Sequence, residues 1–374
     1  MDLARARRIL LCMRFGIGDV VMELPVLETL RRAAPRAHIT ALVAPPAIEL
    51  LEGSPLVDDL ASTARWNITH RWDEGTPETR AALDRWITER EFDTFLDVHH
   101  AAVAVGKVVW GRGIRSLEAD ERSEEQAVAA GHDAVAAIKA AVRTGWGLAV
   151  PDRLAPRIHL RDAERDAAIA ALERTGAARP APIALAPVAS LPMKRWPAHR
   201  FAALADQLSE ETGRPLLLLT GPQVELGDAV LSAMRHADRV ARAEAPHLRQ
   251  VAALLSRCAL LVCNDTGMLH IAAAVGTPVV GVFGPTVPEI YMPRIPRAIG
   301  VVGGDIRCPH RNTRSLHPPG CWSSPHCLIA TRSCVEQVPV DAALAAARRA
   351  LAPEPGAVTP GSPAPPAAPD PFAA

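Results

Sequence analysis

The sequence predicts an α/β protein with two similar halves, each built on a parallel β-sheet. Short apolar runs alternate with helical patterns in both halves, as in folds that repeat a strand and a helix. Proline-rich segments at residues 151–156 and 179–182 separate the halves. The stretch 260–286 reads as a strand, a tight polar loop, a short helix and a second strand, the connection that joins parallel strands.

Composition limits the classes of function. The chain has 374 residues, of which 49% are hydrophobic, enough for two buried cores. Lys plus Arg and Asp plus Glu both number 41, so no overall charge favours a nucleic-acid partner. No apolar run reaches membrane-spanning length, and the apolar part of the N-terminus is too short for a secretory signal. We therefore expect a cytoplasmic protein with reduced cysteines.

The N-terminal half begins with a strand, a glycine-rich loop and a helix. Strands are expected at residues 8–13, 38–43, 92–98 and 108–109, and helices at 20–33, 77–89 and 123–142. The loop contains Gly16 and Gly18, but Val21 occupies the third glycine position of a dinucleotide fingerprint, and no acidic residue follows the second strand. These departures argue against an NAD site.

The loop also supplies a carboxylate, Asp19, at the start of a helix and at the edge of a sheet. Two interpretations remain open for Asp19. It balances the positive end of the helix dipole, or it acts on a ligand bound at this edge of the sheet.

The C-terminal half restarts the same pattern. Strands are expected at residues 183–186, 215–220, 259–263 and 278–283, and helices from residue 197, after residue 225, at 268–275 and at 339–351. Residues 353–374, rich in Pro and Ala, are expected to be a disordered tail.

The polar loop at residues 264–267 is the strongest local signal of a site. Asp265 or Thr266 can cap the following helix, whose first N–H groups then favour an anion such as a phosphate. A cap that binds no ligand is the alternative. Two α/β halves joined by a linker leave a cleft between them, and such clefts are common ligand sites.

The C-terminal region holds a possible metal cluster. Cys308, Cys321, Cys327 and Cys334 follow one another there, but no Cys-x-x-Cys pair occurs. We favour no metal at this position and keep the cluster as the alternative.

Five motifs occur in a recognisable order. They are Gly18-Asp19, Lys194-Arg195-Trp196-Pro197, Gly221-Pro222 with Glu225, Asn264-Asp265-Thr266-Gly267 with His270, and Gly284-Pro285-Thr286. In this order they resemble the motifs of family 9 glycosyltransferases, the ADP-heptose:lipopolysaccharide heptosyltransferases. The resemblance covers about residues 8–350.

The resemblance implies a GT-B fold, in which two Rossmann-like domains face each other across a cleft. It places an acceptor-side domain at residues 1–160, a connection at 161–182 and a sugar-nucleotide domain at 183–352. It also implies inverting transfer from an ADP-sugar, ADP-heptose or a related donor, with no required metal or other cofactor.

The resemblance further assigns the site residues. Asp19 matches the general base that takes the proton of the acceptor hydroxyl. On the donor side, Ser190 and Lys194 match residues at the phosphates, Glu225 a carboxylate on the ribose, Asp265 a carboxylate on the sugar hydroxyls, and Thr266 and Gly267 the helix start at the diphosphate.

The acceptor is less well defined. Phe15 and Ile17 stand where the family often has small hydroxyl residues, and the cysteine segment has no counterpart in the well-known core heptosyltransferases. A phosphorylated glycolipid would suit the local charge of residues 1–40, where Arg31, Arg32 and Arg36 cluster, and would bring the protein to the inner face of the membrane. The alternative for these arginines is that they only complement the C-terminal end of the helix that Asp19 begins. A sugar-nucleotide-binding module without catalysis, or another GT-B enzyme such as an epimerase, are the alternatives.

Overall fold

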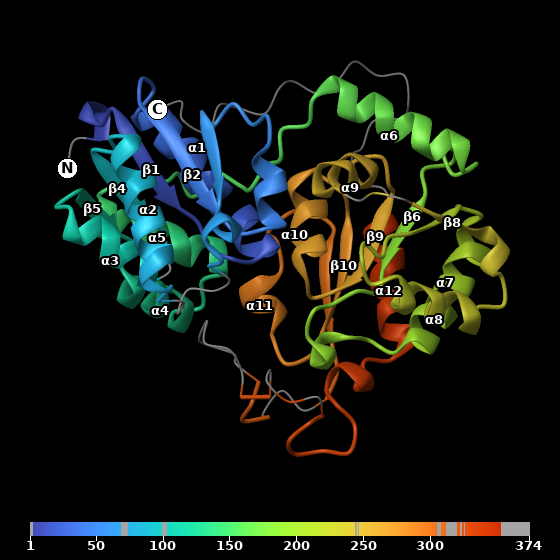
Figure 1. Cartoon of the computed structure of the whole chain (residues 1–374). Coiled ribbons are helices and arrows are strands. Elements are labelled where there is room, and N and C mark those ends of the chain that lie inside the picture. Colours follow the sequence, from blue (N-terminus) through green and yellow to red (C-terminus); the bar gives the residue numbers. More distant parts are fainter. Residues whose placement is uncertain are drawn as a thin grey trace.

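The computed structural model describes residues 3–68, 74–98, 103–243, 245, 247–304, 308–311, 320–321, 324 and 326–352. Within these residues the chain forms two β-sheets, one in each half (Figure 1). The N-terminal sheet has the order β3 (Asp59–Ser62), β2 (His38–Val43), β1 (Arg8–Cys12), β4 (Thr94–Asp97) and β5 (Arg115–Glu118). The C-terminal sheet has the order β11 (Ala298–Val302), β10 (Val279–Phe283), β9 (Leu260–Asn264), β6 (Ile183–Ala186), β7 (Leu216–Leu218) and β8 (Val240–Arg242). All neighbouring strands run parallel, which confirms the predicted fold class.

Helices surround both sheets. The N-terminal half contains α1 (Ile17–Ala33), α2 (Pro77–Glu89), α3 (Val103–Gly111), α4 (Glu121–Ala129) and α5 (Ala134–Trp146). The C-terminal half contains α7 (Ala198–Thr212), α8 (Val224–Ala233), α9 (Leu248–Leu255), α10 (Gly267–Ala274), α11 (Pro288–Tyr291) and α12 (Val340–Leu351), while α6 (Asp162–Arg174) connects the halves. Short 3-10 helices are η1 (Leu3–Arg5), η2 (Ala47–Leu51), η3 (Thr63–Trp66), η4 (Pro192–Lys194), η5 (Ala237–Arg239) and η6 (Val335–Gln337). Across the described ranges, every helix is too short or too polar to cross a bilayer.

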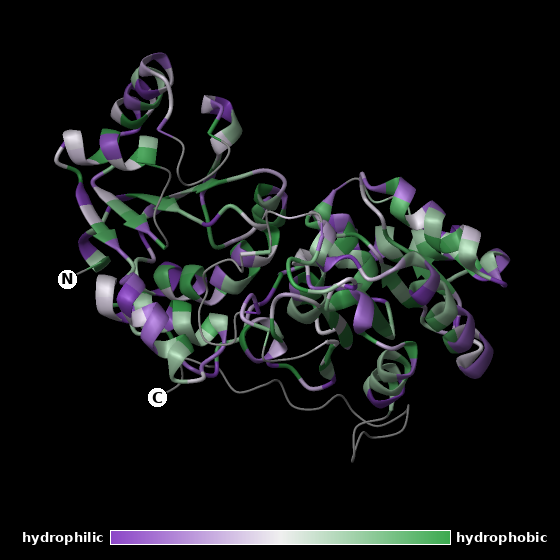
Figure 2. Ribbon diagram, turned by 90° about the horizontal axis from the view of Figure 1, so that it is seen from below, coloured by the Kyte–Doolittle hydropathy of each residue, from purple (hydrophilic) through white to green (hydrophobic). Residues whose placement is uncertain are grey.

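The central strands explain why both sheets form. β1, β9 and β10 are nearly continuous apolar runs and are buried on both faces, as parallel strands covered by helices must be. Figure 2 shows hydrophobic residues concentrated in the strands, whereas the helices carry both hydrophobic and hydrophilic residues. One buried apolar cluster runs through both halves and includes Leu27 of α1 and Leu269 of α10. The halves therefore share part of their core.

Two buried cations hold the segment that connects the halves. Lys139 of α5 donates hydrogen bonds of 2.8 Å to the backbone carbonyls of Pro151, Asp152 and Leu154. These bonds fix the segment after α5, which leads to the connection, against the N-terminal half, because the ammonium group has three donors to satisfy.

Arg249 of α9 contacts three parts of the chain. Its guanidinium donates to the carbonyl of Leu50 in the N-terminal half at 2.9 Å and to the carbonyl of His159 at 2.8 Å. It also pairs through two nitrogens with the carboxylate of Glu164 in α6. One buried side chain thus joins both halves and their connection, with a fork geometry that suits a carboxylate.

Several sequence-based predictions need correction. The strand expected at residues 108–109 is wrong, because these valines lie in α3, where Ala104, Val105, Val108 and Val109 form one buried helical face. The single helix expected at 123–142 is two helices, since Gly131 has a positive φ of 93° after α4 and Asp133 caps α5. The expected tail at residues 353–374 lies outside the described residues.

Candidate active site

Two helix starts, one from each half, touch where the sheets meet. α1 follows β1 and α10 follows β9, so both begin at the carboxyl ends of parallel strands, where open α/β sheets bind ligands. A Cβ atom on Gly18 would lie 2.8 Å from Cδ2 of His270, and one on Gly267 would lie 2.6 Å from Cβ of Ile17. Glycine at both positions therefore permits this close approach of the halves.

Asp19 lies in the first turn of α1. The helix begins after Gly16, which has no side chain to cap it. A Cβ atom on Gly16 would lie 2.2 Å from Oδ2 of Asp19, so the carboxylate folds back over this glycine. A negative charge is favourable at this end of the helix dipole, and the residue is only partly buried. Its position fits both interpretations made from the sequence, a helix-end charge and a base at the cleft.

A buried arginine lies beside Asp19 on the N-terminal side. The side chain of Arg14 is 10% exposed and lies between two buried carboxylates. Its Nε is 3.2 Å from Oε1 of Glu23, and its Nη2 donates to Oε1 of Glu124. Burial lowers the pKa of Arg14, but the charges of Glu124, Glu23 and Asp19 outweigh it and raise the pKa overall. The sequence analysis missed this cluster, although an arginine directly after a buried strand was a usable signal.

An ion pair marks the donor side. Nζ of Lys194 lies 2.8 Å from Oδ2 of Asp265, and the same oxygen accepts a hydrogen bond from Thr286 Oγ1. The side chains of Lys194 and Asp265 are 15% and 5% exposed. Three of the five sequence motifs, far apart in the chain, thus meet at one carboxylate oxygen.

Asn264 positions the loop that carries Lys194. Its side chain is fully buried at the end of β9. Its Oδ1 accepts a hydrogen bond of 3.0 Å from the backbone N–H of Trp196, and its Nδ2 donates to the carbonyl of Pro187 at 2.9 Å. A single amide therefore holds both ends of the loop between β6 and α7, a role that the sequence analysis did not assign.

The start of α10 has no side-chain cap. Thr266 occupies the N-cap position, but its side chain accepts no hydrogen bond from the helix, and its Oγ1 is buried without a partner among the described residues. The prediction that Asp265 or Thr266 caps the helix is wrong, because the Asp265 carboxylate binds Lys194 and Thr286. The N–H groups of the first turn have no side-chain acceptor in the described structure, which leaves them suited to an anion.

Ser190 and Glu225 lie at the same edge of the C-terminal sheet but farther out. Both are exposed, Ser190 in the loop after β6 and Glu225 in the first turn of α8. Gln223 Nε2 donates to the carbonyl of Ala189 at 3.3 Å and so brings the two loops together. The structure does not bring Glu225 into the Lys194–Asp265 ion pair.

His270 and Tyr291 lie between the carboxylates of the two halves. Burial lowers the pKa of His270 against the opposing charges of Asp265 and Asp19, which favours a neutral imidazole. Burial raises the pKa of Tyr291, and the charges of Asp19 and Asp265 raise it further. Both residues line a cavity of about 250 Å³ between α1, α5, α10 and α11. The sequence analysis gave Tyr291 no role.

Comparison with known proteins identifies the family. The profile described as "Glycosyltransferase family 9 (heptosyltransferase)" matches residues 98–317, more than half of the chain. The chain belongs to glycosyltransferase family 9. It is therefore a glycosyltransferase, as the motif order predicted.

Relatives and solved structures support this family. Lipopolysaccharide heptosyltransferase 2 of Salmonella typhimurium is 26% identical over 295 residues, covering 74% of this chain and 82% of the relative. A family 9 glycosyltransferase from Veillonella parvula has a TM-score of 0.71 at 22% identity, covering 94% of this chain and 98% of that one. The Escherichia coli ADP-heptose lipopolysaccharide heptosyltransferase II has a TM-score of 0.64 at 19% identity, covering 92% and 98%. These two likenesses show that the glycosyltransferase has the GT-B fold.

The four cysteines of this family 9 protein lie near one another in its C-terminal region. Burial raises the pKa of Cys321, and the nearby Cys334, Cys308 and Cys327 add to the rise. All four are free thiols. Within the described residues, no group of three or more His, Cys, Asp or Glu side chains is arranged to hold a metal ion. The described geometry therefore adds no support for the metal alternative.

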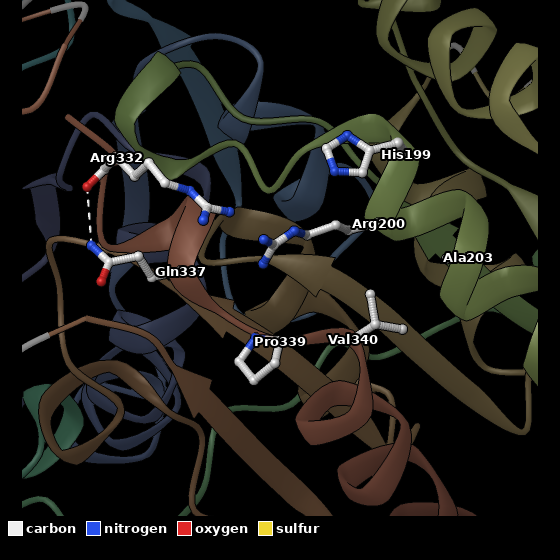
Figure 3. Close-up of a pocket in the computed structure, with 7 residues that line it drawn as sticks. All are labelled: His199, Arg200, Ala203, Arg332, Gln337, Pro339 and Val340. Carbon is white, nitrogen blue, oxygen red and sulfur yellow. Dashed lines mark hydrogen bonds between the residues drawn. The ribbon is translucent and has the colours of Figure 1, made fainter.

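A wide hollow of about 520 Å³ lies outside the Asp19–Lys194 region of the glycosyltransferase, between the starts of α7 and α12. In Figure 3 the guanidinium groups of Arg200 and Arg332 point toward each other across it, and Gln337 Nε2 donates to the Arg332 carbonyl at 3.0 Å. Arg200 and Trp196 both donate to the carbonyl of Val338. The bond from Trp196 therefore ties the end of the Lys194 loop to the segment before α12.

Proposed function

We propose that the protein is an inverting heptosyltransferase that moves heptose from ADP-heptose to a hydroxyl of a lipopolysaccharide-core-type acceptor. The observation that carries the proposal is the meeting of two helix starts, one with Asp19 and the other beside the Lys194–Asp265 pair. A base and an anion-binding site from opposite halves are the two groups that such a transfer needs. The Salmonella relative is a lipopolysaccharide heptosyltransferase and the E. coli structure is that of an ADP-heptose heptosyltransferase. Both support heptose as the transferred sugar, and the second supports ADP-heptose as its source.

Asp19 is the general base in this proposal. Its carboxylate takes the proton of the acceptor hydroxyl while that oxygen forms a bond to the anomeric carbon. The bond between the anomeric carbon and the diphosphate oxygen breaks on the opposite face, and ADP leaves with the electron pair. Attack from the face opposite the leaving group inverts the configuration at the anomeric carbon.

The C-terminal half holds the donor in this proposal. Negative charge grows on the diphosphate as ADP leaves, and Lys194 with the N–H groups of Thr266, Gly267 and the next residue stabilises that charge. The unpartnered Oγ1 of Thr266 supports an added ligand at this helix start. Ser190 serves the phosphates as well.

The remaining donor contacts are to the sugars. Glu225, which is exposed at the start of α8, binds the ribose, and Asp265 binds hydroxyls of the heptose. We propose residues 1–160 as the acceptor domain, 161–182 as the connection and 183–352 as the donor domain. The transfer step requires no metal.

We place the reaction in the cytoplasm, at the inner face of the membrane that carries the acceptor. The arginines differ in how accessible they are to a membrane surface. Arg31 donates to Asp58, Leu56 and Ala37 within the fold, whereas Arg36 is exposed. Arg32 is exposed as well and pairs with Glu28 on its own helix, at 3.5 Å. Arg32 and Arg36 are therefore the better residues to substitute in a liposome-binding assay at low salt, and binding that is unaffected by both substitutions would favour a soluble acceptor.

One assay separates transfer from binding alone. Purified protein is mixed with ADP-heptose, and ADP release is measured with and without deacylated lipopolysaccharide fragments. Release that requires the acceptor, continues in EDTA and yields product of inverted anomeric configuration supports the proposal. Donor binding without release would favour a non-catalytic module, and conversion of the sugar nucleotide without ADP release would favour an epimerase.

A further inference from the structure

We propose that Arg14 is a positioning residue for Asp19, held beside it by the buried carboxylates of Glu23 and Glu124. The inference rests on the proposed role of Asp19 as the base. It concerns residues to which the sequence motifs assign no part in transfer.

The geometry starts from the loop between β1 and α1. The backbone N–H of Arg14 donates to Oε2 of Glu23 at 3.2 Å, and the side chain returns to the same carboxylate, with Nε 3.2 Å from Oε1. Glu23 lies four residues after Asp19 on α1, so the two carboxylates lie on one face of the helix. This arrangement places the guanidinium close to the first turn of α1, which contains Asp19.

Burial makes this arrangement rigid. The side chains of Glu23 and Glu124 are 0% and 1% exposed, and that of Arg14 is 10% exposed. A buried charge is costly unless it is paired, so each member of the cluster fixes the others. Glu124 comes from α4, which follows the edge strand β5, and therefore ties the loop before α1 to a separate element.

The charges give Arg14 a second effect. Burial raises the pKa of Glu23, and the charges of Asp19 and Glu124 raise it further against the opposing effect of Arg14. Asp19, Glu23 and Glu124 are thus close enough to one another for their charges to interact, and Arg14 is the cation that lies among them. Loss of the Arg14 charge would leave Asp19 next to Glu23, a like charge four residues away on the same helix, without the cation that lies among these carboxylates.

Groups from other elements also face Asp19. His270 of α10 and Tyr291 of α11 are close enough to Asp19 for its charge to affect them. Burial favours the neutral form of each. Asp265 and Lys194 on the donor side form their own pair at 2.8 Å. Among these groups Arg14 is the cation not already paired with Asp265, so its loss should have the largest effect on Asp19.

The test compares three variants with wild type. Arg14→Met combined with Glu124→Gln removes the charge pair together, which avoids leaving one buried charge unpaired. Arg14→Lys keeps the positive charge but loses the planar fork. Glu28→Gln, on the same helix but outside the cluster, serves as the matched control. Folding is checked by thermal melting and donor binding by titration with ADP.

The readouts are the pH dependence of kcat/KM for the acceptor and the 13C titration of the Asp19 carboxyl, assigned by difference from Asp19→Asn. For the double variant we expect the acid limb and the 13C midpoint to move up by about one pH unit, with ADP affinity unchanged. Arg14→Lys should restore the midpoint while kcat stays reduced, and Glu28→Gln should leave both unchanged.

A folded double variant with unchanged midpoints would overturn the positioning role. The 13C titration needs no substrate, so it tests Arg14 even if wild type transfers no heptose. In that case the proposed function fails and the effect of Arg14 on Asp19 is still measured.

Discussion

The two sides of the cleft have the same local structure but differ in the charged groups that they present. Each side presents the start of a helix at the end of a buried parallel strand. On the N-terminal side the helix start carries a carboxylate, Asp19, backed by the buried Arg14. On the C-terminal side the carboxylate of Asp265 is turned away to Lys194, and the helix start has no side-chain cap. One helix start therefore suits proton removal, whereas the other suits a negatively charged ligand.

The sharpest way to break this comparison is Asp19→Asn. The amide keeps the shape of the side chain but cannot accept the proton, so we expect transfer to fall about 10²- to 10⁴-fold while ADP affinity is retained. Steady-state rates and ADP titrations measure the two effects. Glu28→Gln, on the same helix, is the control. Near-normal turnover in Asp19→Asn would reduce Asp19 to a helix-end charge.

Lys194→Met tests the opposite side. It removes the charged partner of Asp265 and the cation proposed for the diphosphate, so ADP affinity should fall roughly 10- to 100-fold. Lys107→Met is the matched control, since Lys107 is exposed and pairs with Glu74 away from the cleft. Calorimetric titration with ADP gives the result. Equal affinity in wild type and Lys194→Met would remove Lys194 from the donor site.

Gly18→Ala and Gly267→Ala act on the contact between the two sides. The new methyl group would overlap His270 in the first variant and Ile17 in the second, so the halves must move apart or repack. We expect a loss of roughly 1–3 kcal/mol in stability and a several-fold fall in kcat/KM. Gly111→Ala, where no atom of the described residues lies within 4 Å of the added carbon, should do neither. Melting curves and kinetics that match the control would show that the contact does not matter for transfer.

The smallest expected effect concerns the pair of Arg249 and Glu164, which links α9 to the connection between the halves. Hydrogen bonds from Arg249 are the main cause that lowers the pKa of Glu164 to about 2 from an ordinary 4.5. A carboxyl whose pKa is lower in the folded state stabilises the fold above pH 4.5 and loses this effect as the pH falls toward 2. Urea unfolding from about pH 6 to about pH 3 should therefore show a steeper loss of stability in wild type than in Glu164→Gln. Parallel curves for the two proteins would contradict the assignment.

The fold was predictable because its central strands carry a simple signal. The apolar runs of β1, β9 and β10 predicted strands, and the polar residues after β9 predicted the edge of the sheet. β3, β5 and β8 were missed because these short strands mix polar with apolar residues and are partly exposed. β11 was missed although its residues, Ala298–Val302, are apolar, and it too is mostly only partly buried. The valines of α3 led to a wrong strand prediction. Valine favours strands, but this preference is small compared with what is gained by packing one face of the helix against the core.

The site was only partly predictable for a different reason. Asp19, Lys194 and Asp265 were singled out because each lies in a local motif, and the structure brings Lys194 and Asp265 together. The contacts that position them join distant residues, such as Arg14 to Glu124, which are separated by 110 positions. No local pattern contains such a pair, so the buried arginine and the role of Asn264 became apparent only in three dimensions.

The hydrogen bonds of Asn264 have a consequence for folding kinetics. The amide of Asn264, which holds the Lys194 loop, is 68 positions from Trp196 in the chain. The indole of Trp196 donates a hydrogen bond to the carbonyl of Val338, 142 positions away. Contacts over such distances form slowly, because the chain between them must be ordered first. The Lys194 loop should therefore be among the last parts of the protein to fold. A refolding experiment should recover the circular dichroism of the sheets before it recovers affinity for ADP.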